Sequence, residues 1–148
     1  MKRIVLAVLV LALALPAHAA AGKRSYTGAV DAAAGSIAFT LKKKGKKKKK
    51  KTSVKNFTFR EVPITCEIGA ATTSGRLTFG IRVVKKRFSA DADDGEGSDL
   101  HVEGTLKQKR KRVVGTLRVF GAVPLDPDEQ VRGADCDTGV LEWDAGRA

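Results

Sequence analysis

The 148-residue sequence is poor in the side chains that most enzymes use for chemistry. It contains two cysteines, two histidines, one tryptophan and one tyrosine. It has no G-x-S-x-G nucleophile motif, and no histidines and cysteines at metal-ligand spacing. We therefore expect no catalytic residue, no metal and no cofactor, and we predict that the protein is not an enzyme.

Long apolar runs and helical periodicity are also missing. The apolar stretch at residues 4–15 holds 12 residues, whereas a membrane-spanning helix needs about 20. Nowhere do apolar residues recur at i, i+3, i+4 and i+7 over the length of an amphipathic helix. We therefore expect no transmembrane span.

The apolar stretch has the layout of a secretory signal peptide. Lys2 and Arg3 precede it, and Pro16 and the small-residue sequence at residues 17–19 follow it. We predict a signal peptide at residues 1–19 and a single all-β domain at residues 20–148. The expected location is secreted, either extracellular or associated with the cell envelope.

Acidic residues are scarce relative to basic ones. The chain has 28 Lys plus Arg against 16 Asp plus Glu, a formal net charge of +12. Removal of Lys2 and Arg3 with the signal peptide would lower this charge to +10. An excess of basic over acidic residues favours association with polyanions and says little about the fold.

The two cysteines, Cys66 and Cys136, are 70 residues apart. In an oxidising compartment we expect them to form a disulfide. Closing a loop of this length stabilises a protein by about 4 kcal/mol in the chain-entropy model. Neither cysteine has a C-x-x-C partner or a nearby histidine that would indicate a reactive thiol.

Alternation of apolar and polar residues predicts β-strands. In residues 76–83, Leu77, Phe79, Ile81 and Val83 share one face. The same period of two predicts strands at residues 25–30, 36–41, 52–60, 87–92, 100–106, 113–119 and 138–145. Eight strands with turn-rich connections predict an antiparallel β-sandwich or jelly roll, with an up-and-down β-barrel as the alternative.

If consecutive strands are antiparallel, alternate connections lie at the same end of the domain. One set of connections contains only basic charges and includes a Lys-rich loop at residues 42–51. This set contains seventeen basic residues, which we call the basic pole and predict to bind polyanions. They are Lys42, Lys43, Lys44, Lys46, Lys47, Lys48, Lys49, Lys50, Lys51, Lys85, Lys86, Arg87, Lys107, Lys109, Arg110, Lys111 and Arg112.

The other set of connections is rich in acids and holds both cysteines. It comprises Asp31 and residues 60–76, 91–99 and 126–137, with thirteen of the 16 acids of the chain. We call this set the acidic pole. The strand order thus predicts a molecule with opposite charges at its two ends.

The composition of the basic pole predicts loose specificity. Lysine acts as a point charge without the bidentate geometry of arginine. No aromatic residues interleave with residues 42–51, so base-specific nucleic-acid recognition is not expected. The expected partners are anionic glycans of the envelope or extracellular space, with non-specific DNA as a further candidate. The alternative is a solvated lysine loop without a ligand.

Residues 91–99 resemble a calcium loop. The EF-hand pattern requires Asp or Asn at its fifth position, where Gly95 stands, and the flanking segments are predicted strands rather than helices. We favour an acidic hairpin turn, with an oxygen-ligand calcium site as the alternative.

The remaining candidate functional side chains have structural explanations. His101, Glu103 and Glu142 fall on the outward positions of their strands, which disfavours a general base and a glycosidase carboxylate pair. Tyr26 and Trp143 fall on inward positions, so they are predicted core residues rather than carbohydrate platforms.

Two short motifs add a resemblance. They are V-P-I-T-C at residues 62–66 and a closing C-x-x-G-x-x-x-W at residues 136–143. With its lysine-rich turns, the chain resembles small exported β-rich proteins of unassigned function from high-GC Gram-positive bacteria, over most of residues 25–145. The resemblance implies export and an all-β fold, and it implies no activity.

These observations predict a non-enzymatic exported protein whose basic pole binds anionic polymers with low specificity. Two alternatives belong to other classes. One is a β-barrel carrier of a small apolar ligand. The other is a structural module that self-associates through its oppositely charged poles.

Overall fold

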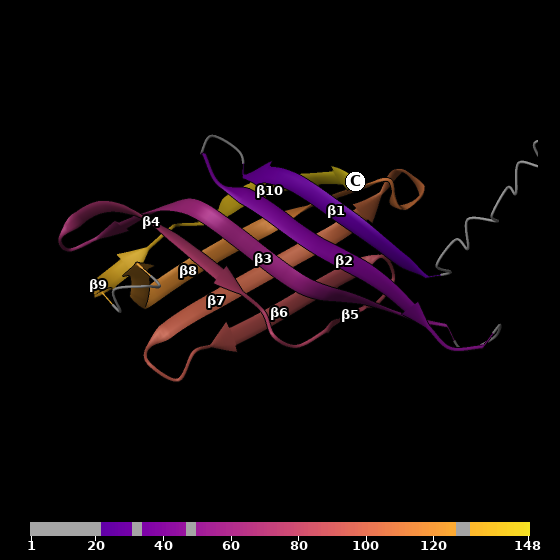
Figure 1. The fold of residues 1–148 in the computed structure, drawn as a ribbon, viewed down its shortest axis with the longest axis horizontal. Helices are drawn as coiled ribbons and strands as arrows, with labels where there is room; N and C mark the ends of the chain where they lie inside the picture. The colour runs from indigo at the N-terminus through magenta and orange to yellow at the C-terminus, as the bar shows by residue number, and fades with distance from the viewer. Residues whose placement is uncertain (1–21, 31–33, 47–49, 127–130) are drawn as a thin grey trace, which may run out of the picture.

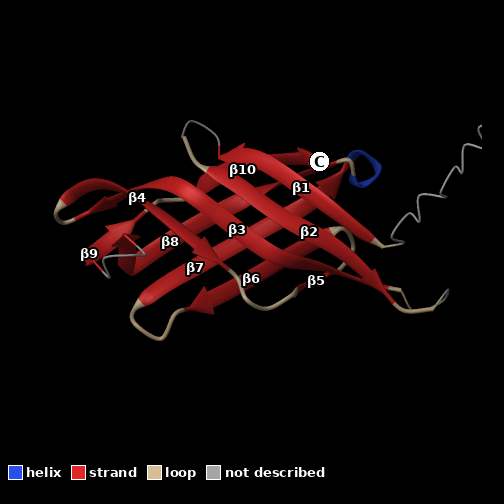
Figure 2. Cartoon of the chain, viewed as in Figure 1, coloured by secondary structure: helices blue, strands red, loops and turns tan. Residues whose placement is uncertain are grey.

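The computed structural model describes residues 22–30, 34–46, 50–126 and 131–148. The predicted signal peptide lies outside these residues, as do Asp31, Lys47, Lys48, Lys49, Asp128 and Glu129. The strands are β1 (Lys23–Val30), β2 (Ser36–Lys44), β3 (Lys51–Cys66), β4 (Gly69–Arg76), β5 (Ile81–Val83), β6 (Arg87–Asp93), β7 (Ser98–Lys107), β8 (Arg112–Asp126), β9 (Val131–Asp137) and β10 (Leu141–Arg147). A short helical turn, η1 (Gln108–Arg110), joins β7 to β8 (Figure 2).

The strands form one antiparallel sheet that folds into two layers. The order is β10-β1-β2-β3-β9-β8-β7-β6, with β4 and β5 paired to β3 and with β10 also paired to β8. Strands β1, β2 and β3 lie across β6, β7 and β8 (Figure 1). The described residues of β4 and β6 share no ladder, and a single bridge, Val84 to Arg87, joins the β5 side to β6. The predicted all-β antiparallel fold is confirmed, as an open two-layer arrangement rather than a closed barrel.

The ten strands of the described residues make eight alternating runs of chain. Strands β4 and β5 both run antiparallel to β3, and β9 and β10 both run antiparallel to β8. Each pair is thus one run with a break in it. The alternation that predicts two charged poles therefore holds in the structure.

The predicted strand at residues 76–83 is wrong between Leu77 and Gly80. Here β4 ends and β5 has not begun, so Phe79 is 45% exposed instead of buried. The cause lies in β3, where Asn56 has a φ of 52° and the pairing with β2 shifts register. This bulge changes which residues of β3 face inward, and the neighbouring strand cannot follow it without leaving the ladder.

Aromatic rings fill the space between the two layers. Phe39 stacks on Tyr26 at 5.0 Å between ring centroids, and it meets Phe57 at 5.8 Å and Trp143 at 5.9 Å. All four side chains are buried, as their strand positions predict. Phe88 supplies a fifth ring to this cluster, in the role that the sequence had assigned to Phe79.

Two glycines make room for these rings. Gly104 and Gly115 face each other across β7 and β8. A Cβ atom on Gly104 would lie 2.2 Å from the Phe88 ring, and one on Gly115 would lie 2.4 Å from Trp143. Any larger residue at either position would displace the core aromatics.

Candidate functional site

The turn between β5 and β6 and the turn between β7 and β8 enclose a groove of about 670 Å³, which we call the basic groove. Strands β1 and β2 contribute to its wall. Its lining residues are Arg24, Lys43, Lys85, Lys86, Thr105, Leu106, Lys107, Gln108, Lys109 and Arg110. Seven of the ten are basic and none is acidic.

The groove unites six of the predicted basic-pole residues: Lys43, Lys85, Lys86, Lys107, Lys109 and Arg110. They come from all three of the predicted basic connections. The exposed residues Lys42, Lys44, Lys46, Lys50 and Lys51 belong to the neighbouring β2–β3 hairpin, where Lys44 pairs with Lys51. Eleven of the seventeen predicted basic-pole residues thus lie in the groove or in the neighbouring hairpin.

Three predicted residues stand apart from the groove. Arg87 lines a separate hollow on the outer side of β6 and β7. Lys111 is exposed beyond η1. Arg112 donates from Nε to both carboxylate oxygens of Asp144, at 2.8 and 2.6 Å, and forms a further ion pair through Nη2. Arg112 is therefore engaged in an intramolecular pair rather than grouped with the groove cations.

Arg24 lines the groove but is not one of the predicted basic-pole residues. The residue pairs with Leu41 across β1 and β2, and its neighbour Lys23 pairs with Lys42. The strand order could have indicated Arg24. The first strand begins at the same end of the domain as the connection at residues 42–51, between the second and third strands. Arg24 precedes the first predicted strand and is not part of a connection between strands, so the prediction of the basic pole leaves it out.

The electrostatics of the groove are those of concentrated positive charge. Repulsion from Arg110, followed by burial and repulsion from Arg24 and Lys50, holds the pKa of Lys43 below its ordinary value. These neighbours come from different segments of the chain. Among the described residues, no carboxylate lies within ion-pair distance of a groove cation.

The β5–β6 turn has an unusual backbone for its sequence. Val84 and Arg87 exchange two backbone hydrogen bonds of 2.8 Å across it. The two central residues, Lys85 and Lys86, have φ of 46° and 70°. Positive φ at both positions defines a type I′ hairpin turn, which favours Asn-Gly. Residues held in the left-handed region without being glycine are destabilising by about 1 kcal/mol or more each.

The β7–β8 turn repeats this feature. Gln108, Lys109 and Arg110 have φ of 43°, 54° and 70°. The hydroxyl of the fully buried Tyr26 donates to the Arg110 carbonyl at 2.5 Å. The Leu106 amide donates to the Lys86 carbonyl at 2.8 Å, which ties the β5–β6 turn to β7, the strand that leads into the β7–β8 turn.

The opposite end of the molecule holds the disulfide. Cys66, at the end of β3, and Cys136, in β9, are bonded and buried, which confirms the predicted bridge. Strand β9 and the β3–β4 hairpin lie far from η1 and the β2–β3 hairpin (Figure 1). The cysteines and the basic groove therefore mark opposite ends of the fold.

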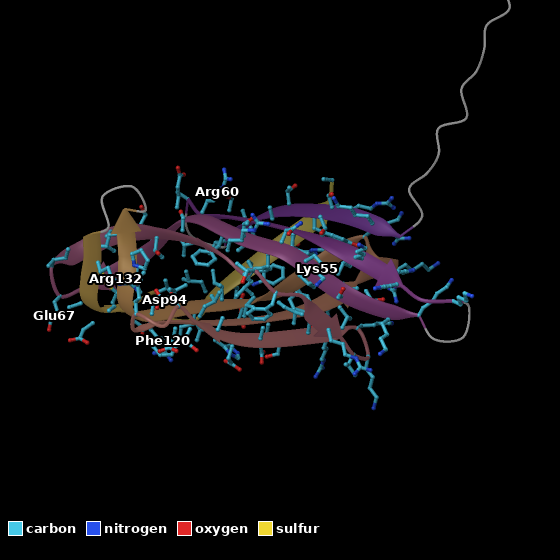
Figure 3. All side chains as sticks on the ribbon, turned by 60° about the horizontal axis from the view of Figure 1, so that its bottom comes forward. Lys55, Arg60, Glu67, Asp94, Phe120 and Arg132 are labelled. Carbon is cyan, nitrogen blue, oxygen red and sulfur yellow. A yellow bond between two sulfur atoms is a disulfide. The ribbon has the colours of Figure 1, made fainter. Side chains whose placement is uncertain are left out.

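The acidic segment at residues 91–99 forms the β6–β7 hairpin turn around an arginine. Arg132 forms ion pairs with Asp94 and Glu96, and its Nε donates to the Ala122 carbonyl at 3.0 Å (Figure 3). Burial alone would raise the pKa of Asp94, but hydrogen bonds from Arg132 and from backbone amides outweigh it and hold that pKa below its ordinary value. In the part of the chain that is described, no group of three metal-ligating side chains is placed to hold an ion.

His101 lies on the outer face of β7, as predicted. Its Nδ1 atom is 2.5 Å from Asp91 Oδ1, and its Nε2 atom is 3.5 Å from Glu103. Glu103 and Glu142 line one open hollow on this face, on either side of Thr116.

The described residues 22–30, 34–46, 50–126 and 131–148 include no helix of the length and hydrophobicity that crossing a bilayer requires.

No family model, curated protein or solved structure matches the chain. The function of the basic groove is therefore inferred from its own chemistry.

Proposed function

We propose that the protein is exported, has no catalytic activity, and binds anionic polymers of the cell envelope or extracellular space through its basic pole. The observation that carries this proposal is the basic groove, in which seven basic side chains from four segments meet and no acidic side chain lines the wall. Gathering like charges this closely is unfavourable in the free protein, as the lowered pKa of Lys43 indicates. A polyanion would relieve that repulsion.

Binding of this kind has a recognisable physical signature. Each cation that contacts the polymer releases condensed counterions, so affinity falls steeply and regularly as salt concentration rises. Five of the seven groove cations are lysines, which contact anionic groups as point charges. We therefore propose affinity for charge density rather than for one sequence of sugars or bases.

The carrier alternative is disfavoured by the packed interior. The rings of Tyr26, Phe39, Phe57 and Trp143 occupy the space between the two layers, where a carrier would hold its ligand. The self-association alternative is disfavoured by the acidic pole, since Asp94, Glu96 and Asp137 are already paired with arginines of the same chain.

The test is a salt titration of binding to dextran sulfate and to long-chain polyphosphate. One variant, Lys85→Gln with Lys86→Gln and Lys109→Gln, removes three groove charges. Its matched control, Lys55→Gln with Arg60→Gln and Arg82→Gln, removes three exposed charges that lie outside the basic pole. We expect the groove variant to bind at least tenfold more weakly at about 0.1 M salt, and its logarithmic salt slope to fall by about three.

The control variant should bind within about threefold of the wild-type protein, because none of its three charges lines the basic groove. Equal losses in both variants would contradict the assignment to the basic pole. Binding that ignores salt would contradict the proposal altogether.

A further inference from the structure

Five of the residues that line the basic groove have left-handed backbone conformations. They are Lys85, Lys86, Gln108, Lys109 and Arg110. None is glycine, asparagine or aspartate, the residues that adopt this conformation most readily. Five of the eight described non-glycine residues with positive φ thus lie in the two turns that form the groove.

The charge of the protein does not explain this strain. An Asn-Gly pair would make the same β5–β6 turn with less strain, and two lysines on any exposed strand position would give the same net charge. The lysines instead occupy the two central positions of the turn. Strained residues persist where the surrounding structure fixes them, and they are frequent at binding sites.

The structure also holds the two turns in a fixed relation. The Leu106 amide joins β7 to the Lys86 carbonyl at 2.8 Å, and the buried Tyr26 hydroxyl anchors Arg110 from β1 at 2.5 Å. A cation on an anchored backbone loses less freedom on binding than one on a loose loop. The groove is thus better organised for binding than a run of lysines alone.

Resting on the proposed function, we infer that the two turns form a preorganised site for tetrahedral oxyanions, the phosphate or sulfate groups of a polymer. In this inference the turns, rather than the lysines of residues 42–51, set most of the affinity. Lys85 and Lys86 line the groove from the β5–β6 turn, Lys109 and Arg110 from the β7–β8 turn, and Arg24 and Lys43 from β1 and β2. A phosphate or sulfate group presents acceptor oxygens in several directions, whereas a carboxylate presents two in one plane.

The experiment compares three double variants that each lose two lysines. Lys85→Asn with Lys86→Gly removes both charges and the strain. Lys85→Gln with Lys86→Gln removes the charges and keeps the strain. Lys44→Gln with Lys46→Gln removes two charges from the exposed hairpin next to the groove. Binding to polyphosphate, dextran sulfate and poly-glutamate of matched charge is measured together with the thermal midpoint.

We expect both turn variants to bind polyphosphate and dextran sulfate at least tenfold more weakly, and the hairpin variant to lose less than threefold. The Asn-Gly variant should unfold about 5 °C higher than the wild-type protein, because two strained residues are relieved. The Gln-Gln variant should show no such gain. Poly-glutamate should bind the wild-type protein at least fivefold more weakly than the other two polymers.

The contrary outcomes are distinct. Equal losses in the turn and hairpin variants would overturn the preorganised site and leave the proposed function standing. An Asn-Gly variant no more stable than the wild-type protein would overturn the argument from strain, and equal binding of poly-glutamate would overturn the oxyanion class. A wild-type protein that binds none of the three polymers would overturn the proposed function itself.

Discussion

The two ends of the molecule treat charge in opposite ways. At the acidic end, Arg132 neutralises Asp94 and Glu96, and Arg118 neutralises Asp137. At the basic end, the described cations of the groove have no carboxylate within ion-pair distance, and they lower the pKa of Lys43 by mutual repulsion. Three carboxylates at the acidic end are thus paired with arginines, whereas the described groove cations have no acidic partner.

The two ends also differ in how their backbone is constrained. The acidic end carries the Cys66–Cys136 disulfide, which constrains the unfolded chain. The basic end carries five left-handed residues in its two turns, whereas the acidic end carries two, Glu61 and Asp135. The covalent constraint thus lies at one end, while the other tolerates charge repulsion and more of the backbone strain. Such a division is typical of proteins in which a binding site costs stability and the remaining structure supplies it.

The largest expected effect tests whether the acidic end supplies stability. Replacing both cysteines, Cys66→Ser with Cys136→Ser, should lower the free energy of unfolding by about 4 kcal/mol, because the bridge closes a loop of 70 residues. Denaturant unfolding of the variant and the wild-type protein measures the difference. Polyphosphate binding by the folded variant serves as the control and should stay within twofold. A loss of stability below about 1 kcal/mol, or a large loss of binding, would contradict the division.

A smaller effect is expected from the arginine at the same end. Arg132→Gln removes two ion pairs and should cost about 1 kcal/mol at pH 7, since ion pairs between partly exposed side chains contribute only modestly. Asp94 has a pKa below its ordinary value in the folded protein, so its contribution is present above pH 4 and is lost as the pH falls through the folded-state pKa.

Urea unfolding at pH 7 and pH 3 should therefore give different losses of unfolding free energy for Arg132→Gln. The gap in stability between the variant and the wild-type protein should narrow at pH 3, because the contribution of Asp94 is lost as the pH falls through its folded-state pKa. Lys109→Gln at the basic end is the control, and it should not lower stability at either pH. A gap of the same size at both pH values would show that Arg132 acts through packing rather than charge.

The sequence predicts the poles because strand direction is a robust property. Breaks at residues 77–80 and 138–140 fall within runs that continue in the same direction, so the alternation of ends survives them. Alternating apolar residues also place Tyr26, Phe39, Phe57 and Trp143 in the core. Long-range charge separation was therefore predictable without the exact strand boundaries.

Other features depend on local irregularities that alternation does not reveal. The bulge at Asn56 has no glycine to mark it, and it removes Phe79 from the core while Phe88 takes part in the aromatic cluster. The left-handed turns likewise consist of long polar residues, which signal no turn type. The pairing of Arg112 with Asp144 arises from register between β8 and β10, which a single strand pattern does not specify.

The smallest effect expected concerns His101, on the face between the two ends. Its bond to Asp91 raises its pKa against the effect of burial, and Glu103 adds to the rise. A raised folded-state pKa means that the contribution to stability is present below about pH 6.5 and is lost as the pH rises through the folded-state value. His101→Gln should therefore cost about 0.5 kcal/mol at pH 5.5 and nothing measurable at pH 9, a small value because the three side chains are largely exposed. Since Arg132→Gln has the opposite pH dependence, unfolding both variants across the same pH range separates the two kinds of pair. A cost for His101→Gln that is equal at pH 5.5 and pH 9 would contradict the assignment of its effect to charge.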